Sequence, residues 1–209
     1  VEDSRVNGAA LIVGGGVGGM SAAIALKRVG VTVELIDADP TWRVYGAGIS
    51  VTGISLRAFN DLGLLDEIST RGFVGCGMRG RSPDGAILFE SPRPENPLPI
   101  QQSGGILRPV LHEILSRAVR KEGVKITLGV TVAALAQETS GVEVTFSDGR
   151  KARYDLVVGA DGIHSQVRGM IFPDLPPPRF TGQGCWRVVA DRAEQVDRTE
   201  MYLGGPVKL

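Results

Sequence analysis

The sequence predicts an α/β fold built around a mainly parallel sheet. Three observations lead to this prediction: short apolar runs alternate with helical patterns, glycine-rich turns separate them, and a strand, a helix and a second strand follow one another before residue 40. The chain has 209 residues, of which 43% are hydrophobic and 22% charged. This composition is ordinary for a globular protein and excludes a disordered chain. Two predicted hairpins and a β-rich C-terminal stretch indicate the beginning of a second, antiparallel layer.

The N-terminal part of the chain is predicted to form one βαβ unit. Residues 9–13 are an apolar run bounded by glycine, which is typical of a buried strand. Residues 20–29 have a helical pattern, and Gly30 stands where a helix is expected to end. Residues 31–36 form the second strand, and Asp37 ends it. Two strands joined by a helix in this way form a parallel unit.

The later elements follow from apolar spacing and turn residues. Residues 55–65 and 108–122 carry apolar side chains at helical intervals, and a short helix is expected within 161–170. The last thirty residues are expected to be β-rich. Strands are predicted at 125–128 and 156–159, hairpins at 78–89 and 141–153, and proline-rich connections at 91–99 and 172–178.

Charge and cysteine content exclude several classes of protein. The chain has 23 Lys and Arg against 23 Asp and Glu, so no strong general attraction to nucleic acid or an anionic membrane is expected. Its two cysteines, Cys76 and Cys185, are too few for a disulfide scaffold or a cysteine-rich zinc site, and no metal site is predicted. No run reaches the roughly 18 apolar residues of a membrane span, and the first residues do not form a signal peptide. We therefore expect a cytoplasmic protein.

A glycine-rich loop joins the first predicted strand to the first helix. It contains G-x-G-x-x-G, in which the first glycine permits a tight turn, the second lets a pyrophosphate approach and the third allows close packing. Asp37 is expected to accept hydrogen bonds from both ribose hydroxyls and to disfavour a 2′-phosphate. This pattern predicts a dinucleotide site for FAD or NAD rather than NADP. The residues expected to contact the cofactor here are Gly14, Gly15, Gly16, Val17, Gly18, Gly19, Asp37 and Ala38.

A second motif follows the last predicted parallel strand. Asp161 and Gly162 lie just beyond the carboxyl end of that strand, where open α/β sheets bind ligands. Asp161 can orient backbone N–H groups around a phosphate or ribose, and Ser165 is placed to cap a helix. Taken alone, an Asp-Gly pair after a strand is more often simply a turn.

Together these motifs resemble the N-terminal half of the FAD-dependent aromatic hydroxylases, the flavoprotein monooxygenases of the p-hydroxybenzoate and salicylate hydroxylase type. The glycine loop with Asp37 resembles their FAD-adenosine site, and Asp161-Gly162 with Ser165 and Arg168 resembles their second FAD and nicotinamide-nucleotide motif. The resemblance implies further contacts: Arg43, Gly48 and Ile49 near the flavin, Arg108 reaching the FAD from a helix start, Val132 in a stretch whose backbone contacts the adenine, and Arg187 in a Trp-Arg strand of the substrate layer.

The resemblance also implies a function and a domain division. NADH or NADPH would reduce FAD, the reduced flavin would add O2 to form a C4a-hydroperoxide, and one oxygen would pass to a small phenolic or heteroaromatic substrate. Residues 1–72 and 107–175 would form a Rossmann-like FAD-binding domain, and residues 73–106 and 176–209 a partial substrate-binding β layer. No catalytic residue and no oligomeric state are predicted.

Two alternatives remain open. The chain could be another flavoprotein oxidoreductase on the same fold, or an FAD-binding half that is inactive without a C-terminal half or a second chain. Two departures from the family favour caution over the flavin contacts: Gly53-Ile54 stand where many members have Pro-Asn, and the late Gly-Asp motif that holds the ribityl chain is absent. Arg43 could instead be a surface charge, and Arg187 could pair with a carboxylate. Trp186 and Tyr202 are expected to be core aromatics.

Overall fold

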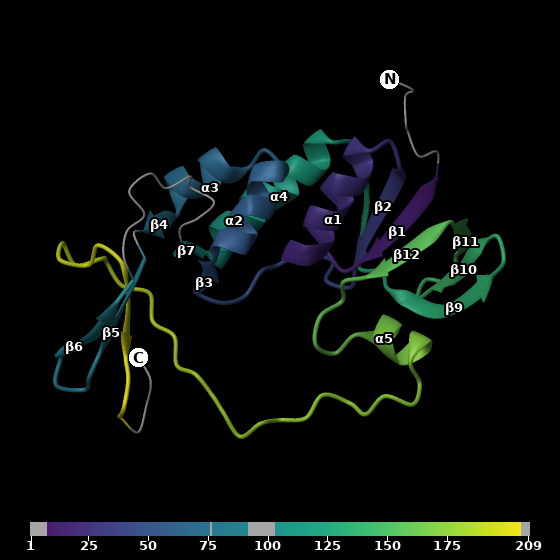
Figure 1. The fold of residues 1–209 in the computed structure, drawn as a ribbon. Coiled ribbons are helices and arrows are strands. Elements are labelled where there is room, and N and C mark those ends of the chain that lie inside the picture. Colours follow the sequence, from purple (N-terminus) through teal and green to yellow (C-terminus); the bar gives the residue numbers. More distant parts are fainter. Residues whose placement is uncertain (1–7, 76, 92–102, 206–209) are drawn as a thin grey trace. The chain divides into compact units, whose positions relative to one another are not determined.

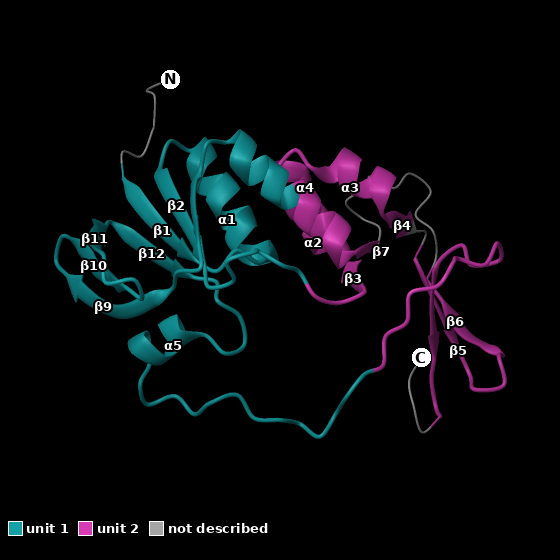
Figure 2. Cartoon of the chain, turned by 180° about the vertical axis from the view of Figure 1, so that it is seen from behind, with its two compact units in different colours: residues 1–44, 115–185 teal, residues 45–114, 186–209 magenta. Residues whose placement is uncertain are grey.

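The computed structural model describes residues 8–75, 77–91 and 103–205. Its contacts divide the chain into two units, which Figure 2 colours separately. Unit 1 comprises residues 1–44 and 115–185, and unit 2 comprises residues 45–114 and 186–209. The domain boundaries expected from the sequence divide the chain by function, so this division by contacts does not test them and they stay a prediction.

Unit 1 is built on a four-stranded parallel sheet with the strand order β12-β1-β2-β8 (Figure 1). Helix α1 (Val17–Arg28) connects β1 to β2, so the predicted βαβ unit and parallel sheet are confirmed. The central strand β1 is apolar, four of its five residues are buried, and neighbouring strands pair with both of its edges. The four strands are β1 (Ala9–Val13), β2 (Thr32–Asp37), β8 (Lys125–Leu128) and β12 (Leu156–Gly159).

A three-stranded antiparallel sheet with the order β11-β10-β9 separates β8 from β12 along the chain. Its inward side chains join Leu11, Val13 and Ile36 of the parallel sheet in one buried cluster. The predicted hairpin at 141–153 is confirmed. Strand β9 is not predicted from the sequence, because most of its residues are small or exposed. These strands are β9 (Val132–Glu138), β10 (Gly141–Phe146) and β11 (Lys151–Tyr154), and the short helix α5 (Gln166–Ile171) follows β12.

A buried carboxylate ties three strands of unit 1 together. Glu34 of β2 is 7% exposed and accepts hydrogen bonds from Lys125 Nζ at 2.9 Å, Tyr154 Oη at 2.8 Å and Thr127 Oγ1 at 3.1 Å. Burial raises the pKa of Glu34, but these hydrogen bonds and the lysine charge outweigh burial and lower it. The ionised carboxylate therefore stabilises the packing of β2 against β8 and β11.

Unit 2 holds two small sheets and two complete helices within its described residues. An antiparallel sheet has the order β3-β7-β4, and a mixed sheet has the order β13-β5-β6. Helix α4 (Arg108–Lys121) begins in unit 2, and its residues from Leu115 onward belong to unit 1. The other elements are β3 (Gly48–Val51), α2 (Gly53–Asp61), α3 (Leu65–Arg71), β4 (Phe73–Gly75), β5 (Met78–Arg81), β6 (Ile87–Glu90), β7 (Ser103–Leu107) and β13 (Thr199–Tyr202).

The structure also differs from the sequence prediction elsewhere. The single helix predicted over 55–65 is interrupted at Gly63, whose φ of +61° turns the chain between α2 and α3. The final thirty residues form one short described strand, β13, and it pairs with β5 in parallel rather than antiparallel. Trp186, expected in a core, is 99% exposed. Most of the proline-rich segment 91–99 lies outside the described residues.

Candidate functional site

A cavity of about 300 Å³ lies at the carboxyl edge of the parallel sheet in unit 1. This is the edge at which open α/β sheets bind ligands. It brings together residues of the two predicted motifs, which are more than 100 positions apart in the sequence. The lining residues are Val13, Gly14, Gly16, Ile36, Asp37, Ala38, Val130, Thr131, Ala160, Asp161 and Gly162.

The glycine loop is tightly packed on one side and open on the other. Gly14 has a φ of +109°, and a Cβ there would collide with the Ala160 carbonyl. A Cβ on Gly19 would collide with the Gly14 carbonyl, whereas a Cβ on Gly16 would meet no protein atom within 4 Å. The first and third glycines of the motif are therefore required for packing. The second leaves space beside the cavity, which is what a bound pyrophosphate would need.

Helix α1 begins at this open side without a capping side chain. Gly16 is its N-cap residue, and the first turn contains no acidic residue. The first N–H groups of a helix have no partner within the helix, and the helix dipole places partial positive charge at that end. Because Gly16 also lines the cavity, the start of α1 is suited to an anionic group such as a phosphate.

Asp37 bonds to the glycine loop through one carboxylate oxygen and to the turn after β2 through the other. Its Oδ2 accepts from the Gly15 N–H at 2.7 Å, and its Oδ1 accepts from the Asp39 N–H at 2.8 Å. The side chain also lines the cavity. A carboxylate oxygen can accept a second hydrogen bond, so ribose contacts remain compatible with this arrangement. Asp37 thus has a structural role in the loop that the motif alone does not reveal.

Asp161 caps helix α5. Its Oδ2 accepts from the backbone N–H groups of Gln166 at 2.7 Å and Val167 at 3.1 Å, and its Oδ1 accepts from Ser165 Oγ at 2.5 Å. Ser165 Oγ in turn accepts from the Arg168 N–H at 2.9 Å, which confirms Ser165 as the helix cap. Both oxygens of Asp161 therefore serve the turn into α5, while Asp161 and Gly162 border the cavity. The wider role of Asp161 toward a phosphate or ribose stays a prediction.

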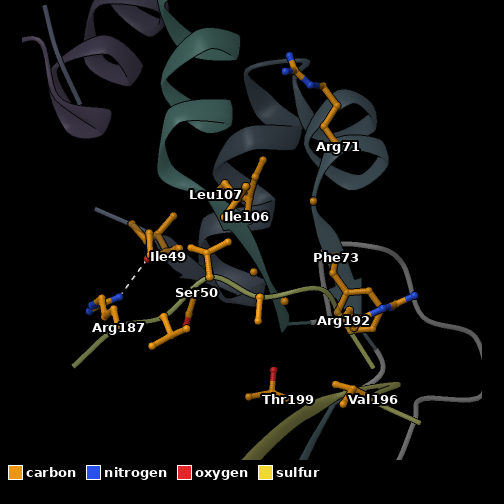
Figure 3. Close-up of a pocket in the computed structure, with 18 of the residues that line it drawn as sticks. Ile49, Ser50, Arg71, Phe73, Ile106, Leu107, Arg187, Arg192, Val196 and Thr199 are labelled. Carbon is orange, nitrogen blue, oxygen red and sulfur yellow. Dashed lines mark hydrogen bonds between the residues drawn. The ribbon is translucent and has the colours of Figure 1, made fainter. Parts of the chain in front are cut away.

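A second cavity, of about 710 Å³, lies within unit 2 (Figure 3). Gly48 and Ile49 line it at the start of β3, and Arg187 Nη1 donates to the Gly48 carbonyl at 3.0 Å, the bond drawn as a dashed line in Figure 3. The guanidinium carbon of Arg192 lies 4.5 Å from the centroid of the Phe73 ring in the same wall. Cationic and aromatic groups in one wall suit an electron-rich or anionic ring.

Comparison with known proteins decides the family. A family model described as FAD binding domain matches residues 8–191. The chain belongs to this FAD-binding family. The putative FAD-dependent monooxygenase YetM of Bacillus subtilis is 31% identical over 201 residues, which are 95% of this chain and 54% of the relative. Aurachin C monooxygenase/isomerase of Stigmatella aurantiaca is 33% identical over 202 residues, which are 90% of this chain and 49% of the relative.

Two solved structures illustrate the fold that this chain shares with known proteins. The tetrameric form of 2-methyl-3-hydroxypyridine-5-carboxylic acid oxygenase has a TM-score of 0.69 and 29% identity, and the match covers 78% of this chain and 42% of that one. An HpxO variant of Klebsiella pneumoniae complexed with FAD has a TM-score of 0.62 and 28% identity, with coverages of 78% and 42%. The resemblance and fold class predicted from the sequence are confirmed. The chain spans about half the length of the relatives it matches.

The resemblance to flavoprotein monooxygenases also implied FAD contacts at residues that do not line the unit 1 cavity. The Arg43 side chain is 60% exposed, and its Nε lies 3.0 Å from Asp39 Oδ2. Val132 is 1% exposed in the core, and the two residues before it, Val130 and Thr131, line the cavity instead. Both belong to the stretch 128–132 that resembles the family's adenine-contacting segment, although only Val132 was expected as a contact. The signal that could have found them is the glycine directly after β8, which turns the chain at the ligand edge of the sheet.

Arg108 belongs to unit 2 with Gly48 and Ile49. It is the first residue of α4, and its N–H donates to the Ala47 carbonyl at 2.9 Å. Its side chain lies so close to Gly46, which has a φ of +110°, that a Cβ there would be 3.0 Å from Arg108 Cδ. The absence of a side chain at Gly46 therefore leaves space for the Arg108 side chain. Within the described ranges, no group of three His, Cys, Asp or Glu side chains could hold a metal ion, and no helix is long and apolar enough to cross a membrane.

Proposed function

We propose that this chain binds FAD through its glycine loop and forms the FAD-binding half of a monooxygenase that uses NADH or NADPH and O2 to hydroxylate a small aromatic substrate. The observation that carries the proposal is the open side of the loop at Gly16, where an uncapped helix start borders the cavity. Membership of the FAD-binding family supports FAD as the ligand. The relatives, which are named as monooxygenases, support the reaction class.

The residues around the unit 1 cavity fit this cofactor. Residues 14–19 would hold the pyrophosphate, because the first N–H groups of α1 have no partner within the helix and Gly16 and Gly18 carry no side chain that would block it. Asp37 and Ala38 would contact the ribose, and Asp161 and Gly162 border the same cavity. Further contacts with FAD are proposed from the resemblance alone for Arg43, Gly48, Ile49, Arg108 and Val132.

FAD, when bound, supplies electron transfer from the nicotinamide and activation of O2. The protein's own task is to hold the cofactor, orient the aromatic ring and keep water from the reacting atoms. We assign Arg187 to the substrate, because it lines the unit 2 cavity and a guanidinium carries more N–H groups than the one that the Gly48 carbonyl accepts. An acidic or phenolic substituent on the ring is the group it would bind.

A two-stage experiment tests the proposal against the alternatives. In the first stage FAD, FMN and NADH are titrated into the complete protein, and preferential binding of FAD is expected. In the second stage oxidation of NADH and NADPH is followed with a panel of phenols and nitrogen heteroaromatics, and products are identified by mass spectrometry. Ring-dependent oxidation with a product that has gained one oxygen is expected.

The other outcomes identify the competing functions. Binding of FAD with oxidation that no ring affects would indicate another flavoprotein oxidoreductase. Binding of FAD with no oxidation at all would indicate a binding half that needs a second chain or a C-terminal half, which the intact mass of every polypeptide in the sample would reveal. Failure to bind FAD would overturn the proposal. The cytoplasmic location stays a prediction.

A further inference from the structure

Trp42 lies outside both sequence motifs, yet it contacts the glycine loop directly. Its side chain is 6% exposed, although Thr41 and Arg43 on either side are exposed. Its indole Nε1–H donates to the Gly15 carbonyl at 2.9 Å in a buried hydrogen bond. A Cβ on Gly15 would collide with the indole nitrogen. The loop and the indole are therefore in close contact, and only glycine at position 15 allows it.

The backbone of Trp42 is held in an unfavourable conformation. Its φ is +50°, and it is the only residue other than glycine with a positive φ among the described residues. Such a conformation is rare for a bulky side chain and persists only where surrounding contacts impose it. The preceding turn supplies some of these contacts: the Trp42 N–H donates to the Asp39 carbonyl at 3.2 Å, and the Thr41 N–H donates to Asp39 Oδ1 at 2.9 Å. The indole hydrogen bond to the loop is another.

This hydrogen bond sets the direction of the next peptide group. The peptide between Gly15 and Gly16 is trans, so its C=O and N–H groups point in opposite directions. Since the Gly15 carbonyl is turned toward Trp42, the Gly16 N–H points away from Trp42. Gly16 lines the cavity and Trp42 does not. Asp37 meanwhile holds the Gly15 N–H, so the protein occupies both polar groups of Gly15.

A cation holds the indole from another direction. The guanidinium carbon of Arg120, on α4, lies 4.9 Å from the centroid of the Trp42 ring. Arg120 is itself held by a hydrogen bond of 3.3 Å from its Nη1 to the Ser116 carbonyl. A cation over an indole face is an attractive arrangement. The ring is thereby kept in place to donate to Gly15.

We propose that Trp42 is a positioning residue for the phosphate-binding loop: its indole N–H orients the Gly15–Gly16 peptide so that the Gly16 N–H is presented to the pyrophosphate of FAD. The inference rests on the proposed FAD site. Trp42 does not line the cavity, so it acts through the loop. If Trp42 were only an anchor for the segment after β2, its replacement would lower stability without changing the environment of the bound pyrophosphate.

The test compares Trp42→Phe with the parent in the complete protein. Phenylalanine keeps an aromatic ring and removes the N–H. Binding of FAD is expected to weaken about tenfold, as the loss of one hydrogen bond that orders the loop would cause. The ³¹P resonances of the bound pyrophosphate are expected to shift. Trp186→Phe, at the other tryptophan of the chain, is the control for these resonances because Trp186 is 99% exposed and does not line the unit 1 cavity.

The outcomes separate this inference from the proposed function. If parent and Trp42→Phe bind FAD with equal affinity and equal ³¹P shifts, the positioning role is overturned while the FAD site stands. If the parent fails to bind FAD, the proposed function fails and this inference fails with it. If Trp42→Phe does not fold, the indole N–H signal of Trp42 is followed in the unsubstituted protein, with assignment from Trp186→Phe. That signal is expected to exchange slowly and to shift on addition of FAD, and an unmoved signal would overturn the inference.

Discussion

Gly16→Ala separates the two roles that a loop glycine can have, packing against protein and making room for a ligand. At Gly16 the backbone is extended, with φ −73° and ψ −178°, which any residue can adopt. An added Cβ would meet no protein atom within 4 Å. The flavin-free protein should therefore accept the methyl group. A pyrophosphate lying against Gly16 should not.

The two effects differ in size. Alanine is a poorer helix N-cap than glycine, but it also restricts the unfolded chain, so the free energy of unfolding should change by less than about 1 kcal/mol. The methyl group would push phosphate oxygens away from the N–H groups at the start of α1. Loss of one or two hydrogen bonds to a charged group, at about 1.5–3 kcal/mol each, predicts FAD binding weaker by roughly tenfold to about 10⁴-fold.

Urea unfolding of the flavin-free protein and titration with FAD, followed by flavin fluorescence, measure the two quantities. Gly169→Ala is the matched control, because a Cβ at this α5 position also meets no atom within 4 Å; it should bind FAD as the parent does. If Gly16→Ala bound FAD with the parent's affinity, the loop would not hold the pyrophosphate. If it lost more than about 2 kcal/mol of stability, Gly16 would be needed for the fold itself and the reasoning from open space would be refuted.

Three further substitutions test contacts around the site. Gly19→Ala would place a Cβ against the Gly14 carbonyl and should destabilise the flavin-free protein by about 3 kcal/mol, measured as a lower Tm. Asp161→Ala removes the acceptor for two backbone N–H groups of α5; it should cost about 1–2 kcal/mol and speed amide exchange in α5, read by mass spectrometry. Glu34→Gln should cost about 2 kcal/mol near neutral pH. Folding lowers the pKa of Glu34, so the stability that its carboxylate contributes is complete above the unfolded pKa of 4.5 and is lost as pH falls through the folded pKa. In urea unfolding, the difference in free energy of unfolding between the parent and Glu34→Gln should therefore shrink in acid. An unchanged Tm for Gly19→Ala would contradict the packing at Gly19, and unchanged amide exchange in Asp161→Ala would contradict the cap of α5. A stability difference for Glu34→Gln that does not depend on pH would contradict the role of the ionised carboxylate.

The structure changes how Asp37 can be used in such experiments. Asp37 was predicted as a ribose ligand, and Asp37→Ala would be the obvious test of that role. In the structure its two oxygens also hold the backbone of Gly15 and Asp39. Its replacement would therefore loosen the loop whether or not a ribose binds. Gly16→Ala tests cofactor binding more directly, because an added Cβ there meets no protein atom within 4 Å.

Asp161 shows a similar overlap of structural and ligand roles. From the sequence, the Asp-Gly pair could be a simple turn or part of a ligand site. The structure supports the turn directly, since both carboxylate oxygens serve Ser165 and the start of α5. It also puts Asp161 and Gly162 in the wall of the cavity. A carboxylate that caps a helix can shape a ligand site through the backbone it holds.

The sequence by itself determined the βαβ unit, the glycine loop and the carboxylate at the end of β2. It could do so because strand and helix periodicity, glycine turns and helix stops depend on residues close together in the chain. The same local signals predicted both hairpins and the last parallel strand. They failed at Gly63, where a single turn residue within an apolar pattern divides one predicted helix into two.

Only the tertiary structure decided which further residues reach the site. Within the predicted adenine stretch 128–132, Val130 and Thr131 rather than Val132 line the cavity because β8 pairs with β2, and Trp42 reaches Gly15 across 27 positions of sequence. The parallel pairing of β13 with β5 joins segments about 120 residues apart. Contacts of this kind depend on how strands align after the chain has folded, and no local periodicity encodes them. The chemistry of the loop could thus be read from the sequence, while the means by which the fold holds that loop in place could not.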